Sequence, residues 1–254
     1  MTQTIAVAGK GGTGKTTITS IVVRYLLKHH FGPILAVDAD SNANLGDSLG
    51  FKVEGTVGQI LDDFQKEKIE IPAGMTKESY LEIKLNGAIV ESKDMDLLTM
   101  GRGEGPECYC YPNVMLRKLI DTLAGNYARM VMDNEAGMEH LSRRTTRDIG
   151  DLLLVSSHSV KGVRTLKRMQ ELITQLRLQV KRQWVLINAV PKGELEPLVA
   201  EEIARQEFTS IIIVPYDDEA YHYDLQLKPL LELPDSSPAV MVIDELMVKI
   251  MNNA

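Results

Sequence analysis

Cysteine, tryptophan and long apolar runs are scarce in this chain of 254 residues. Its two cysteines, Cys108 and Cys110, stand too close together for a disulfide framework and suit a reduced cytoplasm. Apolar runs such as 152–155 and 211–214 fall far short of the roughly 20 residues that a membrane-spanning helix needs. The N-terminus also lacks the basic and apolar segments of a secretory signal. We therefore expect a cytoplasmic protein without a membrane partner.

An excess of positive charge is absent as well. The 28 basic residues are outnumbered by 35 acidic ones, which gives a net charge of −7 and a pI near 5.3. General nucleic-acid binding depends on clustered lysine and arginine, so this composition argues against a nucleic-acid partner. Hydrophobic residues make up 44% of the chain and charged residues 25%, which are ordinary values for a globular protein with a sizeable core.

The sequence does contain a regular alternation of short apolar runs and longer amphipathic segments. Apolar runs bounded by Gly, Asp or Pro are typical of buried strands in a parallel sheet. The expected strands are Thr4–Ala8, Ile34–Val37, Leu97–Met100, Arg129–Met132, Leu152–Ser156, Trp184–Asn188 and Ile211–Val214. The expected helices are roughly Lys15–His29, Asn113–Leu123, Val160–Leu176, Leu195–Arg205 and Ala239–Met251.

This order predicts a doubly wound α/β fold with a mostly parallel sheet and helices on both faces. The sequence has no internal repeat and no low-complexity linker, so we expect one domain over residues 1–254. Residues 50–93 are highly charged and interrupt the alternation. We expect helices and loops there, inserted between the second and third core strands.

Residues 9–16 read Gly-Lys-Gly-Gly-Thr-Gly-Lys-Thr and connect an expected strand to an expected helix. Glycines allow backbone N–H groups to approach an anion closely, and the helix N-terminus adds partial positive charge. In such a loop Lys15 reaches the β- and γ-phosphates and the Thr16 hydroxyl holds Mg²⁺. The pattern predicts a site for ATP or ADP with Mg²⁺, formed by Gly11, Gly12, Thr13, Gly14, Lys15, Thr16 and Thr17.

A dinucleotide site is the competing interpretation of these glycines. They also match G-x-G-x-x-G, and Asp38 ends the second expected strand, where a dinucleotide fold places its ribose-binding acid. However, Lys15 and Thr16 have no role in dinucleotide binding, and a second acid follows at Asp40. Asp133 ends another apolar strand, which is where a phosphate-loop enzyme needs a Mg²⁺ ligand. The ATP interpretation is therefore favoured.

Lys10 gives the loop a lysine at both ends. The run Lys10-Gly-Gly-Thr-Gly-Lys15 resembles the deviant Walker A loop of the MinD/ParA-type ATPases, which are relatives of the nitrogenase iron protein. The resemblance implies a homodimer that forms with nucleotide, in which Lys10 reaches the partner's phosphates and stabilises the charge that develops during hydrolysis. A solvated loop lysine is the other interpretation of Lys10.

Further segments follow the same family pattern over nearly the whole chain. The run Asp38-Ala-Asp40-Ser-Asn resembles the first switch, which implies that Asp38 holds Mg²⁺ through water and that Asp40 orients the attacking water. The run Asp133-Asn-Glu-Ala-Gly137 resembles a Walker B strand, with Asp133 on Mg²⁺, that leads into the second switch. The implied catalytic residues are Lys10, Lys15 and Asp40, and the implied adenine-side residues are Asn188, Pro215 and Asp217.

Cys108 and Cys110 lie in a Gly/Pro-rich loop, residues 101–113. Two cysteines separated by one residue can direct both thiolates at one point, but a closed tetrahedral zinc site needs four ligands. A two-fold dimer would supply the other two, and soft thiolates suit Zn²⁺, Cu⁺ or Ni²⁺. Two partly buried cysteines without a metal are the alternative, although structural cysteines favour apolar cores.

The two lysines of the phosphate loop, the Glu-Cys-Tyr-Cys-Tyr segment and the Asp-Asn-Glu-Ala-Gly switch together resemble one branch of the family. This branch contains the nickel-insertion accessory ATPases of carbon monoxide dehydrogenase. The resemblance implies Ni²⁺ or Zn²⁺ between two subunits and a nickel-containing carbon monoxide dehydrogenase as the client. A positioning or partition ATPase with incidental cysteines is the alternative function.

Overall fold

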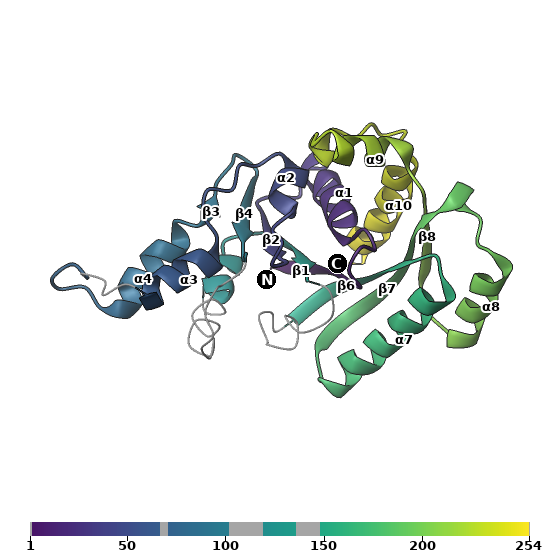
Figure 1. Cartoon of the computed structure of the whole chain (residues 1–254), viewed down its shortest axis with the longest axis horizontal. Coiled ribbons are helices and arrows are strands. Elements are labelled where there is room, and N and C mark those ends of the chain that lie inside the picture. Colours follow the sequence, from purple (N-terminus) through teal and green to yellow (C-terminus); the bar gives the residue numbers. More distant parts are fainter. Residues whose placement is uncertain (1, 67–70, 102–118, 136–147, 254) are drawn as a thin grey trace.

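The computed structural model describes residues 2–66, 71–101, 119–135 and 148–253, and eight strands within these ranges form one sheet (Figure 1). The strands are β1 (Gln3–Gly9), β2 (Ile34–Ala39), β3 (Ile89–Val90), β4 (Met95–Thr99), β5 (Arg129–Asn134), β6 (Asp148–Ser157), β7 (Gln179–Val190) and β8 (Ile211–Pro215). Their order is β3-β4-β2-β5-β1-β6-β7-β8, and every pairing is parallel except that of β3 with β4. The predicted mostly parallel sheet is confirmed.

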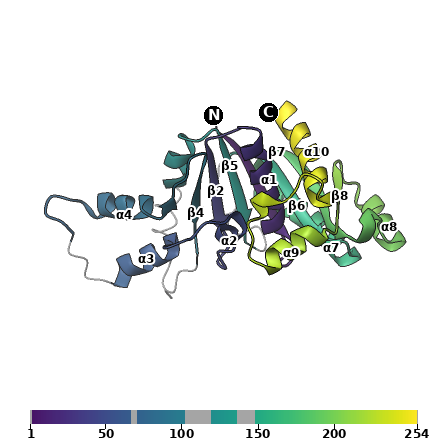
Figure 2. The same ribbon diagram turned by 90° about the horizontal axis from the view of Figure 1, so that it is seen from above.

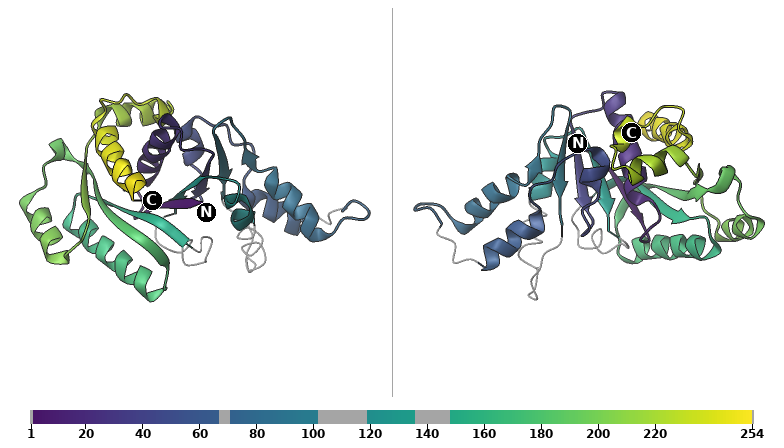
Figure 3. Two further views of the ribbon diagram at one scale, coloured as in Figure 1. Left: turned by 180° about the vertical axis from the view of Figure 1, so that it is seen from behind. Right: turned by 45° about the horizontal axis from the view of Figure 1, so that its top comes forward.

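Helices cover both faces of this sheet (Figures 2 and 3). One face carries α1 (Lys15–Lys28), α2 (Leu45–Leu49), α9 (Asp218–Leu225) and α10 (Pro238–Asn252). The opposite face carries α7 (Val160–Gln175) and α8 (Pro197–Gln206). Near the β3–β4 edge, α3 (Val57–Lys66) and α4 (Lys77–Asn86) form an arm that extends away from the rest of the chain.

The alternation of side chains along β1 explains why the sheet has two apolar layers. Successive side chains of a strand point to opposite faces. Ile5 and Val7 therefore pack with the core under α1 and α10, while Ala6 and Ala8 pack with the core under α7 and α8. All four are completely buried, so β1 stands in the centre of the sheet with its C-terminal end directed at the phosphate loop.

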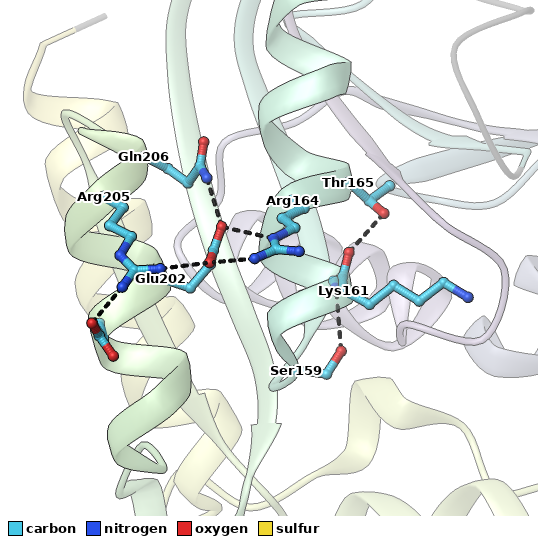
Figure 4. Close-up of polar contacts among 9 residues, drawn as sticks. Ser159, Lys161, Arg164, Thr165, Glu202, Arg205 and Gln206 are labelled. Atoms are coloured by element: carbon cyan, nitrogen blue, oxygen red, sulfur yellow. Dashed lines mark hydrogen bonds and ion pairs between the residues drawn. The ribbon is translucent and has the colours of Figure 1, made fainter.

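On the second face, α7 and α8 are joined by a bidentate ion pair (Figure 4). Arg164 donates two hydrogen bonds, of 3.0 and 3.1 Å, to the carboxylate of Glu202, which is almost completely buried. Gln206 donates a third to the same carboxylate at 2.7 Å. These contacts fix the two helices on the half of the sheet formed by β6, β7 and β8.

The predicted strands all occur, extended by a few residues at most ends, and four predicted helices occur as α1, α7, α8 and α10. The predicted helix Asn113–Leu123 lies mostly outside the described residues, and 119–124 is helical. The insertion contains the predicted helices, α3 and α4, together with the short strand β3. Helix α9 was not predicted, because its sequence is short and polar and shows no apolar stripe.

Candidate nucleotide-binding site

The phosphate loop connects β1 to α1, and its backbone has the shape that only glycine adopts easily. Gly12 has a φ of +74° and Gly14 a φ of +85°. At Gly14 a Cβ would collide with the side-chain amide of Asn188. That amide donates a 2.9 Å hydrogen bond to the carbonyl of Thr13. Asn188, predicted on the adenine side, therefore lies directly against the phosphate loop.

The two lysines of the loop have different surroundings. Lys15 is 6% exposed, and its ammonium donates to the carbonyl oxygen of Lys10 at 3.4 Å. The Thr13 hydroxyl donates to the same carbonyl at 2.8 Å. Lys10 itself is exposed. Lys15 is therefore held within its own loop, whereas Lys10 is exposed to solvent.

Two buried aspartates lie side by side at the carboxyl ends of neighbouring strands. Asp38 on β2 pairs in register with Asp133 on β5, and both are completely buried. The Thr16 hydroxyl donates a 2.6 Å hydrogen bond to Asp133 Oδ2. Asp133 Oδ1 is buried and accepts no hydrogen bond from any of the described residues. The first residues of α1 and the ends of β2 and β5 thus meet at one point.

Burial changes the acidity of both aspartates. Removal from water, opposed by the Thr16 hydrogen bond and reinforced by Asp38, raises the pKa of Asp133 from 3.8 to about 7. Burial likewise raises the pKa of Asp38 to about 6, although Asp38 accepts backbone hydrogen bonds from Leu45 and Asp40 at 2.9 and 3.0 Å. Burial thus favours the protonated form of both carboxyls, and a cation beside them would favour their ionised forms.

The residues at this point suit Mg²⁺. Mg²⁺ prefers oxygen ligands and is usually held by one or two carboxylates together with phosphate and water oxygens. Thr16 offers a hydroxyl, and Asp133 offers a carboxylate oxygen that has no partner in the part of the chain that the structure describes. Asp38 adds negative charge next to them, but both of its oxygens already accept backbone N–H groups. This arrangement is compatible with a water-mediated role of Asp38.

Asp40 lies in the loop that follows β2. Its Oδ1 accepts hydrogen bonds from the backbone and side-chain nitrogens of Asn42, at 2.9 and 3.0 Å. The next residue, Ser41, donates a 3.0 Å hydrogen bond to Oε1 of Glu135, which follows β5. The structure therefore places Asp40 beside the two buried aspartates, with its carboxylate bound within its own loop.

On the other side of the phosphate loop, Pro215 ends β8 and Asp217 precedes α9. Oδ1 of Asp217 accepts the N–H groups of Glu219 and Ala220, at 3.0 and 3.1 Å. Oδ2 accepts a hydrogen bond from the hydroxyl of Ser237 and a second one, of 2.9 Å, from the N–H of Ala239. Asp217 therefore holds the first turns of two helices, a structural role that sequence analysis did not predict.

A cavity of about 320 Å³ opens beside the first residues of α1. Its volume is at the lower end of the range for small-molecule pockets, about 300 to 1,000 Å³. Predicted residues Thr16 and Thr17 line it, but Asn188, Pro215 and Asp217 do not. The lining residues that sequence analysis missed come from α2 and from the segment around the end of α9: Asn44, Asp47, Ser48, Asp224, Leu227, Lys228 and Leu230. No local motif identifies them, because only the fold brings these segments to α1.

The predicted soft-metal ligands, Cys108 and Cys110, lie outside the described residues. Within the described ranges, no group of three or more histidine, cysteine or acidic side chains is arranged to hold a metal ion. The same ranges contain no helix that is long and apolar enough to cross a membrane.

Comparison with known proteins agrees with this geometry. A family model for the CobQ/CobB/MinD/ParA nucleotide binding domain matches residues 4–230. The chain is 43% identical to an uncharacterized ATP-binding protein of Methanocaldococcus jannaschii over 250 residues, 98% of each chain. It is 26% identical over 186 residues to the carbon monoxide dehydrogenase accessory protein CooC of Rhodospirillum rubrum, covering 69% of this chain and 70% of CooC. The fold is similar to that of the cell division ATPase MinD of Pyrococcus furiosus, with a TM-score of 0.71, 20% identity and complete coverage of both chains.

Proposed function

Because the chain belongs to the CobQ/CobB/MinD/ParA family of P-loop nucleotide-binding proteins, we propose that it is an ATPase that carries Ni²⁺ or Zn²⁺ and assists nickel insertion into a carbon monoxide dehydrogenase. The ATPase part follows from the family and from the site around Lys15, Thr16 and Asp133. The metal part is supported by the pair Cys108 and Cys110 and by the similarity to CooC.

At the nucleotide site, each residue has a proposed task. The backbone of the phosphate loop and Lys15 bind the β- and γ-phosphates, and Thr16 and Asp133 hold Mg²⁺. Mg²⁺ supplies a positive charge that neutralises the phosphate oxygens and lowers the pKa of the carboxylates around it. Asp40 orients the attacking water through Oδ2, while Oδ1 keeps its hydrogen bonds from Asn42. Asn188, Pro215 and Asp217 lie on the adenine side.

Hydrolysis is completed across a homodimer in this proposal. Lys10 is exposed, and its ammonium group is one of the two positive charges of the phosphate loop, the other being that of Lys15. A lysine from the partner subunit that meets the transferring phosphoryl group stabilises charge that develops only in the transition state. Turnover then depends on protein concentration, and the metal site can form in the same dimer from two cysteines of each chain.

A short path connects the nucleotide site to the segment with the cysteines. The backbone N–H of Met100 donates a 2.8 Å hydrogen bond to the carbonyl of Asp38. The next residue, Gly101, has a φ of +61°, and a Cβ there would collide with Thr56. Gly101 is also the first residue of the loop 101–113 and precedes Cys108 by seven positions in the sequence. A change around Asp38 would therefore reach the start of the cysteine segment directly, which supports coupling between nucleotide and metal.

Metal analysis with light scattering tests the metal part. The reduced protein receives Ni²⁺ or Zn²⁺ under anaerobic conditions and is then freed of excess metal, beside the Cys108→Ser/Cys110→Ser variant. We expect one metal ion per two chains and a dimer that the variant fails to form. Equal metal retention and equal mass for both proteins would contradict the metallochaperone and favour the positioning or partition ATPase.

Steady-state ATP hydrolysis as a function of protein concentration tests the dimer mechanism. Lys10→Ala is expected to lower turnover while ATP affinity changes little, because Lys15 still binds the phosphates of its own chain. Lys161→Ala serves as the matched control, because it removes an exposed lysine that lies on α7, outside the phosphate loop. Unchanged turnover and dimerisation in the Lys10 variant would contradict a role across the subunit interface.

A further inference from the structure

The loops that follow β2 and β5 are connected by a hydrogen bond between residues 94 positions apart in the sequence. The ladder between these strands ends with Ala39 paired with Asn134. The next residues along the two strands are Asp40 and Glu135. Beyond this point Ser41 Oγ donates to Glu135 Oε1 at 3.0 Å. The bond therefore continues the connection between the strands where the backbone ladder stops.

The loop after β2 is a tightly bonded unit. The N–H of Asp40 donates to Asp38 Oδ1, and the N–H of Leu45 donates to Asp38 Oδ2. The N–H of Asn42 donates to Asp40 Oδ1 at 2.9 Å, and that of Ala43 donates to the carbonyl of Asp40 at 3.1 Å. A loop with so many internal bonds moves as one piece, so a contact at one of its residues positions the others.

Ala43 supports the view that this loop is held in a defined shape. Its φ of +54° lies in the left-handed region, which costs free energy for a residue with a Cβ. Such conformations persist only where the surroundings impose them. The bond from Ser41 to Glu135 is one of those surroundings, and it acts next to Asp40.

We propose that Glu135 is a positioning residue for ATP hydrolysis, which acts by accepting the Ser41 hydroxyl and so holds Asp40 at the end of β2. The charge of Glu135 is not required for this task, but an acceptor oxygen at its position is. This inference rests on the ATPase activity and is independent of the metal. It also gives Glu135, which the sequence alone leaves without a role, a defined function.

ATP turnover of three variants tests the proposal. Ser41→Ala and Glu135→Ala are each expected to lower kcat about ten-fold or more, with KM within about two-fold of wild type. Glu135→Gln keeps an acceptor oxygen and should retain kcat within about three-fold. The double Ser41→Ala/Glu135→Ala variant should be no slower than Glu135→Ala, because each substitution already removes the same hydrogen bond between Ser41 and Glu135. Ser79→Ala on α4 removes an exposed hydroxyl far from the site and is the control.

Amide hydrogen exchange of the nucleotide-free protein provides a readout without catalysis. Ser41→Ala and Glu135→Ala should speed exchange at Asn42 and Leu45, whereas Glu135→Gln should not. Normal turnover and exchange in Ser41→Ala would overturn the proposal, as would a Glu135→Gln variant as slow as Glu135→Ala. If wild type hydrolysed no ATP at all, the proposed function would fail, while the exchange data would still decide whether Glu135 holds the loop.

Discussion

Replacement of Asp133 by Asn should change how the stability of the nucleotide-free protein depends on pH. The Asp133 carboxyl is completely buried, and burial raises its pKa from 3.8 to about 7. Between these values the folded chain holds a proton that the unfolded chain has released. Wild-type stability therefore decreases as pH rises from about 4 to about 7 through this group, and the variant lacks this contribution.

The size of the effect follows from the shift. A change of about three pKa units, at about 1.36 kcal/mol per unit, amounts to at most about 4 kcal/mol. The free energy of unfolding of Asp133→Asn minus that of wild type should thus increase with pH by up to about 1.4 kcal/mol per unit. The variant also changes the hydrogen bond with Thr16, but that offset is the same at every pH. The titration of Asp38 cancels in the difference to a first approximation.

Urea unfolding of both proteins between pH 5 and pH 8, without nucleotide or Mg²⁺, measures this difference. A second series with Mg·ADP in excess should flatten the wild-type profile, because a dication next to Asp133 favours the ionised carboxylate. A difference that stays constant across the pH range would refute the reasoning, since Asp133 would then titrate near its ordinary pKa. A difference that decreases with pH would refute its sign.

Two further substitutions test the loop and the core. Gly14→Ala should weaken ATP binding in calorimetry at least ten-fold, because the new Cβ meets the side-chain amide of Asn188 and φ is +85°. Gly74→Ala should leave binding unchanged, because Gly74 has a similar φ of +88° but its Cβ would meet no atom of the described residues within 4 Å. Arg182→Leu should cost about 3 kcal/mol in urea unfolding, because Asp151, completely buried, loses a bidentate partner at 2.7 Å. Arg205→Leu removes an exposed ion pair with Glu201 and a longer, 4.0 Å contact with Glu202, which keeps its bidentate partner Arg164, and should cost less than about 1 kcal/mol. Equal effects within either pair of variants would contradict the assignment.

Much of the fold was predictable because the buried strands carry nearly continuous apolar runs. The apolar run 152–155 indicates a strand, and the amphipathic spacing of apolar residues in α7 indicates a helix. Neither prediction requires knowledge of the segments that pack against them. The order of the strands was not predictable in the same way, because it depends on pairings between distant segments. Asp38 and Asp133 end their strands in the sequence, yet only the ladder between β2 and β5 shows that they are neighbours.

The candidate site was predictable where a motif is local. Residues 9–17 are contiguous, so the phosphate loop could be identified from the sequence. Asp217 illustrates the limit. Its position after β8 was visible, but its hydrogen bonds to the start of α10 involve Ser237 and Ala239, which are 20 and 22 residues away. The cavity beside Thr17 has the same origin, because α2 and the end of α9 are distant in the sequence.

Helix α10 is attached to the rest of the chain at both ends, and this has a practical consequence. Its start is bonded to Asp217 on the nucleotide side, and near its end the carbonyl of Ile250 accepts a 3.1 Å hydrogen bond from Arg182. A spin label on the exposed residue Val248 would therefore report from a stationary reference point. A second label on Ile83, 58% exposed on the α3–α4 arm, would turn any movement of the arm during the nucleotide cycle into a measurable distance change.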